Sequence, residues 1–210
     1  MFIALDGIDG AGKSTQIALL TRWLTDQGEQ VISLRDPGST ATGEAIRQIL
    51  LDSQLQMHRR CEALLYMAAR SQLVEERIRP ALAEGKTVVS DRFLLANVVY
   101  QSVGKAVDAD LLWRLGEIAT ARLQPDLTLL LDLPAGEAVK RQRNPPDRVE
   151  SRGQAYMEQV RQAFLLQLPA ASPQTAVIDA SQSVASMHTA IVQQVQRVRH
   201  AHLQQPPDPG

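Results

Sequence analysis

The chain has 210 residues, of which 44% are hydrophobic and 21% are charged, and its formal net charge is -1. This composition is typical of a globular domain with a sizeable core, and the balanced charge argues against binding to a nucleic-acid polymer. No apolar stretch is long enough to span a membrane, and no basic segment precedes the first apolar run as in a signal peptide. The single cysteine, Cys61, excludes an internal disulfide. We therefore expect a cytoplasmic protein with one domain over residues 1–203 and a disordered, Pro-rich tail at 204–210.

The chain begins with an apolar run at residues 2–5, and a core strand is predicted at 2–6. The run leads into a segment with the spacing G-x-x-x-x-G-K-[ST] of a phosphate-binding P-loop, followed by the start of a predicted helix. Such glycines turn backbone N–H groups toward a phosphate, Lys13 can reach the β- and γ-phosphates, and the Ser14 hydroxyl can ligate Mg²⁺. A purely structural Gly-rich turn is the alternative, and the strand and helix around the motif weigh against it. The sequence therefore predicts a nucleoside triphosphate site at Gly7, Ile8, Asp9, Gly10, Ala11, Gly12, Lys13, Ser14 and Thr15.

Short β-rich runs alternate with longer helical patterns along the rest of the chain, which predicts βαβ units. The fold class is α/β, with a parallel five-stranded sheet flanked by helices and the P-loop after its first strand. The strands are expected near 2–6, 30–34, 86–90, 127–132 and 175–179. The helices are expected at 13–27, 60–84, 95–103, 108–122, 135–143, 154–168 and 183–202. Pro80 is expected to kink or break the long helix near its end.

The segment at about 141–153 differs from its surroundings, because it carries several arginines and two prolines. It can be a solvated surface loop, or it can be a lid whose arginines close over a triphosphate. A P-loop in the same chain favours the lid. Two of its arginines, Arg143 and Arg148, are the candidates for direct contact with the transferring phosphates.

A second signal lies at the end of the predicted strand 86–90, where Asp91 is followed by Arg92. The carboxyl ends of parallel strands border the crevice in which doubly wound sheets bind ligands. There Asp91 can hold Mg²⁺, directly or through water, and Arg92 can bind a phosphate with two parallel hydrogen bonds. A surface Asp–Arg pair is the alternative. Asp132 also ends an apolar strand and competes with Asp91, but it has no basic neighbour in sequence.

A P-loop indicates a nucleotide without specifying the reaction. The chain lacks the Asn-Lys-x-Asp sequence expected of a GTPase, and it is short for a motor or transporter ATPase. A small kinase that acts on a small acceptor fits its length best. A non-catalytic nucleotide-binding regulator is the alternative from another class, and the intact P-loop argues against it.

With these motifs taken together, the chain resembles the thymidylate kinase family over nearly its whole length. The resemblance lies in the segments 7–15, 35–40, 44–47, 66–70, 91–93, 125–129 and 147–150, with a weaker match at 177–180. It implies phosphorylation of dTMP by ATP with Mg²⁺, in a protein that is usually a homodimer through helices beside the sheet. Another small-acceptor P-loop kinase, for a different nucleotide or a deoxynucleoside, is the alternative function.

The resemblance also implies roles for single residues at the acceptor side. Arg35 matches an arginine near the transferring phosphates, although Asp36 and Ser39 replace the usual Glu and Gly beside it. Tyr66 matches the aromatic residue that stacks on thymine, and Arg70, one helical turn later, matches the residue that contacts the base carbonyl.

The remaining implied acceptor contacts follow the Asp91-Arg92 pair and the P-loop. Arg92 would bind the dTMP phosphate, Asn97 the base, Tyr100 the deoxyribose, and Asp9 the sugar 3′-hydroxyl. The acceptor phosphate is already largely ionised near neutral pH, since its second pKa is about 6, so no general base is required. Lys13, Arg92 and a lid arginine would instead neutralise charge. Some relatives use an arginine where this chain has Gly10, which is why Arg143 or Arg148 is expected to supply that charge.

Overall fold

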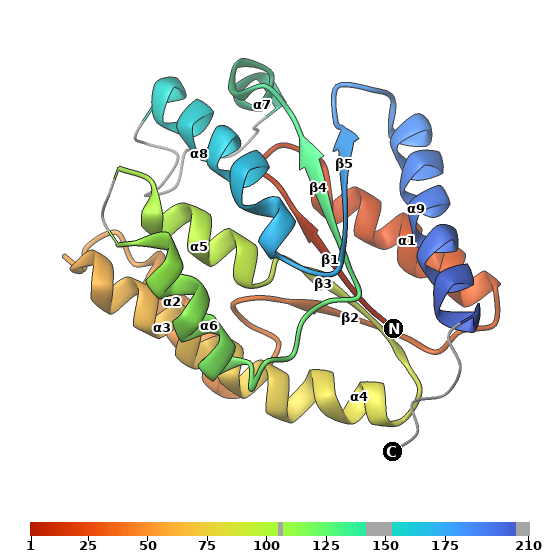
Figure 1. Ribbon diagram of the computed structural model, residues 1–210. Coiled ribbons are helices and arrows are strands. Elements are labelled where there is room, and N and C mark those ends of the chain that lie inside the picture. Colours follow the sequence, from red (N-terminus) through yellow and green to blue (C-terminus); the bar gives the residue numbers. More distant parts are fainter. Residues whose placement is uncertain (105–106, 142–152, 205–210) are drawn as a thin grey trace.

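The computed structural model describes residues 1–104, 107–141 and 153–204, with side chains described up to residue 201 (Figure 1). It contains one five-stranded sheet in the order β2-β3-β1-β4-β5, and the paired strands are all parallel. This confirms the predicted fold class. The strands are β1 (Phe2–Asp6), β2 (Val31–Arg35), β3 (Thr87–Asp91), β4 (Leu127–Asp132) and β5 (Gln174–Asp179), each within one residue of its expected bounds.

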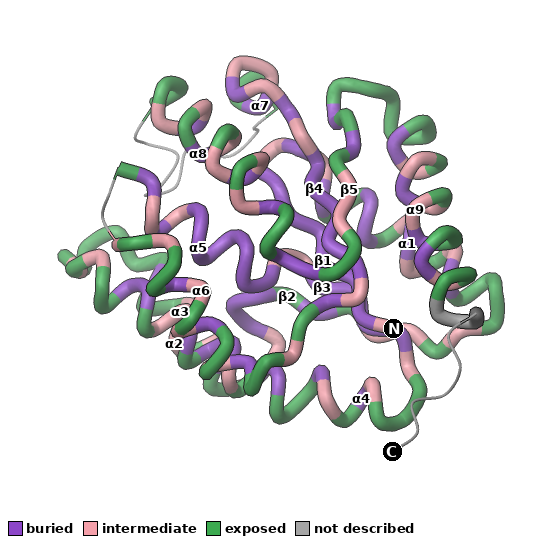
Figure 2. Tube along the Cα trace, in the orientation of Figure 1, coloured by how far each residue is buried: buried purple, intermediate pink, exposed green. Residues whose placement is uncertain are grey.

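The centre of the sheet is apolar because helices cover both of its faces (Figure 2). Every residue of β1 is buried, whereas the edge strands β2 and β5 are partly exposed. Side chains of β1 alternate between two core clusters. Ile3 and Leu5 share a cluster with Leu20 of the first helix, and Phe2 and Ala4 belong to the other.

Helices of several lengths surround the sheet in the described part of the chain. They are α1 (Lys13–Asp26), α2 (Ala41–Leu51), α3 (Arg59–Leu73), α4 (Arg79–Ala83), α5 (Leu94–Ser102), α6 (Ala109–Ala119), α7 (Ala135–Arg141), α8 (Gln154–Gln167) and α9 (Val184–Gln204). In Figure 1, α1 and α9 lie together on one side of the sheet, and α3, α4, α5, α6 and α8 lie on the other. None of the helices in these described ranges is long and apolar enough to cross a membrane.

The five strands all end on a charged residue at the same edge of the sheet. These residues are Asp6, Arg35, Asp91, Asp132 and Asp179. Because the strands are parallel, their carboxyl ends meet at the crevice where this class of sheet binds ligands. The fold therefore concentrates charge at one place, and the P-loop follows β1 at that place.

Helix α2 was not predicted from the sequence. Its first turn is capped by Thr40, whose Oγ1 accepts a hydrogen bond of 2.9 Å from the N–H of Gly43. The Pro, Gly, Ser and Thr residues before it favour turns, and Gly43 in the first turn is a poor helix former. These local signals concealed a helix that packs on α3.

The predicted helix 60–84 is divided into α3, a π-helical turn at Val74–Ile78, and α4. Pro80 lies at the start of α4. Proline has no N–H for the helical bond to the preceding turn, and the wider π turn just before it accommodates that loss. The break predicted near Pro80 therefore takes the form of a π-helical turn just before this proline.

Two predictions fall outside the described residues. The Arg-rich segment 141–153, including Arg143 and Arg148, lies in the undescribed residues 142–152 apart from its two end residues, and the predicted tail lies in 205–210 apart from its first residue.

Candidate functional site

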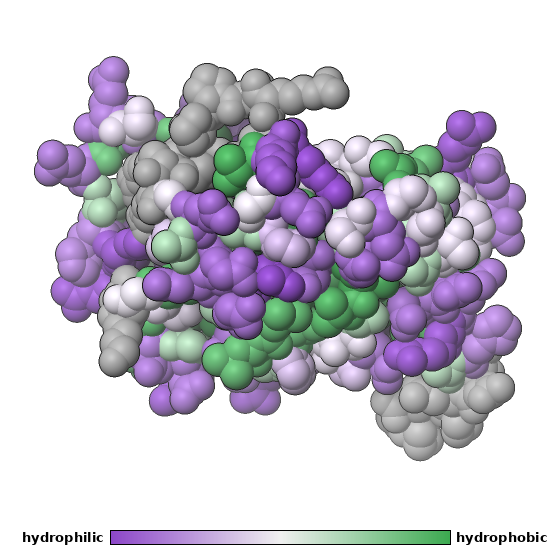
Figure 3. Space-filling model, turned by 90° about the horizontal axis from the view of Figure 1, so that it is seen from above, coloured by the Kyte–Doolittle hydropathy of each residue, from purple (hydrophilic) through white to green (hydrophobic). Residues whose placement is uncertain are grey.

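A cleft of about 340 Å³ opens beside the P-loop, at the carboxyl ends of the strands. Figure 3 looks onto this end of the molecule, where hydrophilic residues predominate around a hydrophobic band. The cleft is lined by Asp9, Gly10, Gly12, Lys13, Ser14, Thr15, Arg35, Asp36, Arg47, Asp91 and Arg92. Four cationic and three acidic side chains therefore surround one small volume, which suits an anionic ligand bound with a cation.

Lys13 is held at the mouth of the P-loop by oxygen atoms of the loop itself. Its Nζ donates to the carbonyls of Gly7 and Ile8 at 3.0 and 3.1 Å, and to Asp9 Oδ1 at 3.2 Å. Burial and the nearby Arg92 lower the pKa of Lys13. Its ammonium group is thus already desolvated and oriented, so an incoming phosphate replaces carbonyl oxygens rather than bulk water.

Arg92 joins the end of β3 to the P-loop. Its Nη2 donates to Asp9 Oδ1 at 2.6 Å, and its Nη1 donates to the Gly7 carbonyl at 3.0 Å. Although burial alone would raise the pKa of Asp9, Arg92 and Lys13 hold it well below its usual range. Asp9 therefore stays ionised between two cations, as a residue that accepts a hydroxyl hydrogen bond should.

The backbone at Arg92 adopts a conformation that is uncommon for residues other than glycine, with φ at 67°. Ser90 Oγ donates to the Arg92 carbonyl at 2.7 Å, and the guanidinium carbon lies 5.2 Å from the centre of the Tyr100 ring. Such strain is typical of functional sites, because the surroundings must impose it. Here it turns the guanidinium back over the P-loop.

Two predicted metal ligands, Ser14 and Asp91, line the same cleft. Asp91 Oδ1 is buried and has no hydrogen-bond partner among the described residues. Buried carboxylate oxygens are costly unless paired, and a hard cation such as Mg²⁺ binds oxygen ligands. The residues present therefore fit the predicted ion.

Asp6, at the end of β1, is a further acidic group that the sequence analysis did not single out. It is completely buried, and neither of its carboxylate oxygens has a hydrogen-bond partner among the described residues. Burial raises the pKa of Asp6 to about 7, and Arg92 and Lys13 only partly oppose this effect. The sequence analysis included Asp6 in the predicted strand 2–6 and gave it no role, because nothing local in the sequence marks its carboxylate as buried.

This shift predicts a pH dependence of stability. The folded protein holds a proton on Asp6 up to about pH 7, whereas the unfolded chain releases it near 3.8. The resulting stabilisation is present below pH 4 and is lost as the pH rises to about 7, by roughly 4 kcal/mol. We expect Asp6→Asn to remove this dependence, so that the variant matches the natural chain at pH 4 and exceeds it in stability at pH 8. Urea unfolding at both pH values measures the difference, and parallel pH profiles for the two proteins would disprove the assignment.

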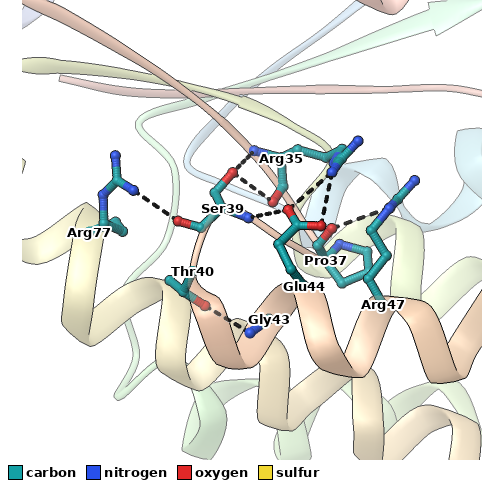
Figure 4. Close-up of polar contacts among 8 residues, drawn as sticks. All are labelled: Arg35, Pro37, Ser39, Thr40, Gly43, Glu44, Arg47 and Arg77. Atoms are coloured by element: carbon teal, nitrogen blue, oxygen red, sulfur yellow. Dashed lines mark hydrogen bonds and ion pairs between the residues drawn. The ribbon is translucent and has the colours of Figure 1, made fainter.

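Arg35 is held by a cluster of polar contacts around the turn that follows β2 (Figure 4). Its Nη2 donates to both carboxylate oxygens of Glu44, at 3.0 and 3.2 Å. Glu44 Oε1 also accepts from the backbone N–H of Ser39 at 2.9 Å, and Arg77 donates to the Ser39 carbonyl at 2.9 Å. The serine that replaces the usual glycine thus takes part in the turn, since its Oγ accepts from the N–H of Arg35 at 2.8 Å.

Arg70 lies in a buried polar network instead of lining the cleft. Its Nε donates to Asp36 Oδ2 at 2.6 Å, and its Nη1 donates to Asn97 Oδ1 at 2.9 Å. Its Nη2 donates to the Phe93 carbonyl at 3.3 Å, and only 1% of the side chain is exposed. Asn97 in turn donates to Gln101 Oε1 at 2.8 Å. Asp36, which replaces the usual Glu of the family, is therefore the counter-ion of Arg70.

The two aromatic residues predicted to contact the acceptor, Tyr66 and Tyr100, lie on different helices. Tyr66 is half-buried one helical turn before Arg70 on α3, and it lies close enough to Arg47 to influence its pKa. Tyr100 packs edge-on against Phe164, with ring centres 5.7 Å apart, beneath the guanidinium of Arg92. Neither ring is among the described lining of the 340 Å³ cleft.

A sequence model of the family described as thymidylate kinase matches residues 5–191. The chain belongs to the thymidylate kinase family. A thymidylate kinase of Rhodopirellula baltica is 58% identical over 182 residues, which cover 87% of this chain and 74% of that protein. Thymidylate kinases of Thermosipho africanus and Chlorobium chlorochromatii are each 38% identical and cover 97% of this chain, over 100% and 97% of their own lengths. The family resemblance inferred from the sequence is confirmed.

The structure adds Arg47 to the candidate site of this thymidylate kinase family member. The sequence analysis gave Arg47 no role, although it lies in one of the matching segments. It lines the cleft from α2, and its Nη1 donates to the Pro37 carbonyl at 3.2 Å. The three-residue spacing from Glu44 is a signal that a predicted helix at 41–51 would have revealed, since both side chains then share one face.

Proposed function

We propose that the chain transfers the γ-phosphoryl group of ATP directly to the phosphate of dTMP, giving dTDP. The observation that carries this proposal is the Asp9–Arg92 contact of 2.6 Å within the cleft that also holds Lys13. The proposed donor-binding loop and the proposed acceptor-binding arginine therefore line one small volume. Such proximity suits the alignment of two anionic phosphates.

The proposed reaction depends on charge rather than on proton transfer. Lys13 would bind the donor phosphates with the P-loop amides, and Arg92 would bind the acceptor phosphate with Arg35 and Arg47 nearby. Mg²⁺ carried by ATP would supply further positive charge at Ser14 and Asp91. Asp9, kept ionised by its two cations, would accept a hydrogen bond from the sugar 3′-hydroxyl.

The acceptor base is proposed to lie toward α3 and α5, with Tyr66 stacking on it and Tyr100 beside the sugar. Arg70 would contact the base carbonyl and Asn97 would contact the base, both from the buried network that holds them. Because Arg70 already holds Asp36 and Asn97, its orientation is fixed before a ligand arrives. Fixed donors of this kind favour one base over another.

The test of this proposal is a panel of acceptors with ATP. We expect dTMP to have the highest kcat/KM among dTMP, dUMP, dCMP, dGMP and thymidine. A higher value for another nucleotide or for thymidine would favour the alternative of a different small-acceptor kinase. No ADP release with any acceptor would favour a nucleotide-binding regulator.

We also propose that the segment 141–153 acts as a lid and that Arg143 or Arg148 contacts the transferring phosphates. The motivation is that the P-loop has glycine at position 10 and brings no arginine of its own. Replacing the contributing arginine by alanine is expected to lower kcat by about 10³-fold, as for other arginines that stabilise a transferring phosphoryl group. Near-normal kcat in both single variants and in the double variant would refute the role of these two arginines.

A homodimer is proposed from an apolar surface on α3 and α6. Leu64, Leu111 and Ile118 are 55%, 57% and 79% exposed, and the two helices pack side by side. Exposed apolar side chains that form one surface mark interaction sites, and we propose that these three do so. Sedimentation should give twice the chain mass, and Ile118→Glu should shift the particle toward monomer. A monomeric natural chain would contradict the proposal. We also propose a cytoplasmic location, as the composition of the chain suggests.

A further inference from the structure

Asp132, at the end of β4, is the one strand-end carboxylate that the sequence analysis considered and the proposed function does not use. The structure places it against Arg161 of α8. Arg161 Nε donates to Asp132 Oδ1 at 2.6 Å, and Nη2 donates to Oδ2 at 2.8 Å. The side chains are only 18% and 23% exposed. Two parallel, charge-assisted bonds fix the angle between two groups as well as their distance, so α8 is oriented with respect to the sheet.

Arg161 also connects to the start of α7. Its Nη1 donates to Glu158 Oε1 at 3.0 Å, and Glu158 Oε2 accepts from the backbone N–H of Ala135 at 3.3 Å. Ala135 is the first residue of α7. A carboxylate at a helix start satisfies a free N–H group and interacts well with the helix dipole. One guanidinium therefore links β4, α7 and α8.

Helix α7 in turn supports the P-loop. A Cβ atom added at Gly10 would lie 2.9 Å from the Ala138 carbonyl, so the loop and the helix are in close contact. On the same helix, a Cβ atom at Gly136 would lie 3.0 Å from Gln154 Nε2, at the start of α8. Contacts therefore run without interruption from Asp132 and Arg161, through α7, to Gly10.

We propose that Arg161 is a positioning residue for phosphoryl transfer, which fixes α7 against Gly10 through Asp132 and Glu158 and so sets the position of the P-loop. This inference rests on the proposed function of the cleft. It gives Asp132 a role that differs from metal binding. A displacement of about 1 Å at a reacting group can cost about 100-fold in rate, so a support of this kind affects catalysis without touching a substrate.

The test compares Arg161→Gln and Arg161→Lys with Arg22→Gln. Arg22 is a matched control, because its contact with Asp26 is exposed and lies on the outer side of α1. We expect Arg161→Gln to lower kcat by about 10- to 100-fold while KM for dTMP changes little, because the P-loop serves the donor. Arg161→Lys keeps the charge but loses the second parallel bond, and an intermediate kcat is expected. Arg22→Gln should keep the natural kcat.

A coupling experiment separates positioning from general stability. Asp132→Asn should lower kcat, and the double variant should be no worse than Arg161→Gln alone, since the Asp132–Arg161 contact is broken in all three variants and Arg161→Gln also removes the contact with Glu158. Assays run well below the measured Tm of each variant. A normal kcat in folded Arg161→Gln, or in Arg161→Lys if the glutamine variant does not fold, overturns the inference. Failure of the natural chain to phosphorylate dTMP would instead contradict the proposed function.

Discussion

Replacing Arg92 by glutamine is expected to lower kcat by about 10³-fold, an effect as large as that expected for the contributing lid arginine. The substitution removes the contact of 2.6 Å with Asp9, and it removes the cation that we propose binds the acceptor phosphate. Glutamine keeps part of the aliphatic stem and a polar end, and it must adopt the same strained backbone conformation at φ 67°. The measurement is steady-state dTDP formation at saturating ATP and dTMP.

Arg92→Lys is the control for charge. It keeps the positive charge but cannot contact Asp9 and the Gly7 carbonyl from two nitrogens as Arg92 does. An intermediate kcat in Arg92→Lys would show that geometry and charge both matter. A kcat within about threefold of the natural value in Arg92→Gln would exclude Arg92 from the transfer step.

The largest expected effect on stability is at Arg70. Arg70→Met would leave Asp36 buried without its counter-ion, which costs about 3–5 kcal/mol in comparable buried pairs. Burial already raises the pKa of Asp36, and Arg70 opposes this rise more strongly than Arg92 does. Without Arg70 the pKa of Asp36 should rise further, so the loss of stability should be smaller at pH 5 than at pH 8. Urea unfolding at the two pH values measures this.

The double variant Arg70→Met with Asp36→Asn is the matched control for the buried charge. It removes the ionisable partner, so part of the stability lost in Arg70→Met should return at pH 8. The remaining loss that the buried Asp36 charge caused should no longer differ between pH 5 and pH 8. A loss below about 1 kcal/mol in Arg70→Met, or a loss that is equal at both pH values, would contradict the paired-charge assignment.

The sheet could be predicted from the sequence because each strand is a short apolar run that ends on a charged residue. The P-loop could be predicted because its chemistry depends on residues that are adjacent in the chain. Both are local signals, and the parallel arrangement follows from the alternation of strands and helices. The proximity of Arg92 to the P-loop followed from the rule that strand ends meet at one crevice.

The remaining features depend on contacts between residues far apart in sequence. Asp36 and Arg70 are 34 residues apart, and Asp132 and Arg161 are 29 apart. No local sequence pattern marks these pairs, so the sequence predicted Arg70 only as a ligand contact and Asp132 only as a competing metal ligand. Helix α2 was missed for the opposite reason, because its turn-forming residues dominated the local pattern although packing on α3 favours a helix.

The central claim is that one cleft transfers a phosphoryl group directly between two bound nucleotides. It is tested most directly by a single turnover with ATP labelled in the γ-phosphate, excess protein and dTMP, stopped with acid. We predict that the label passes entirely to dTDP at the rate at which ADP appears, with none attached to the protein. Label on the protein before dTDP appears, or ADP formed without labelled dTDP, would contradict the account.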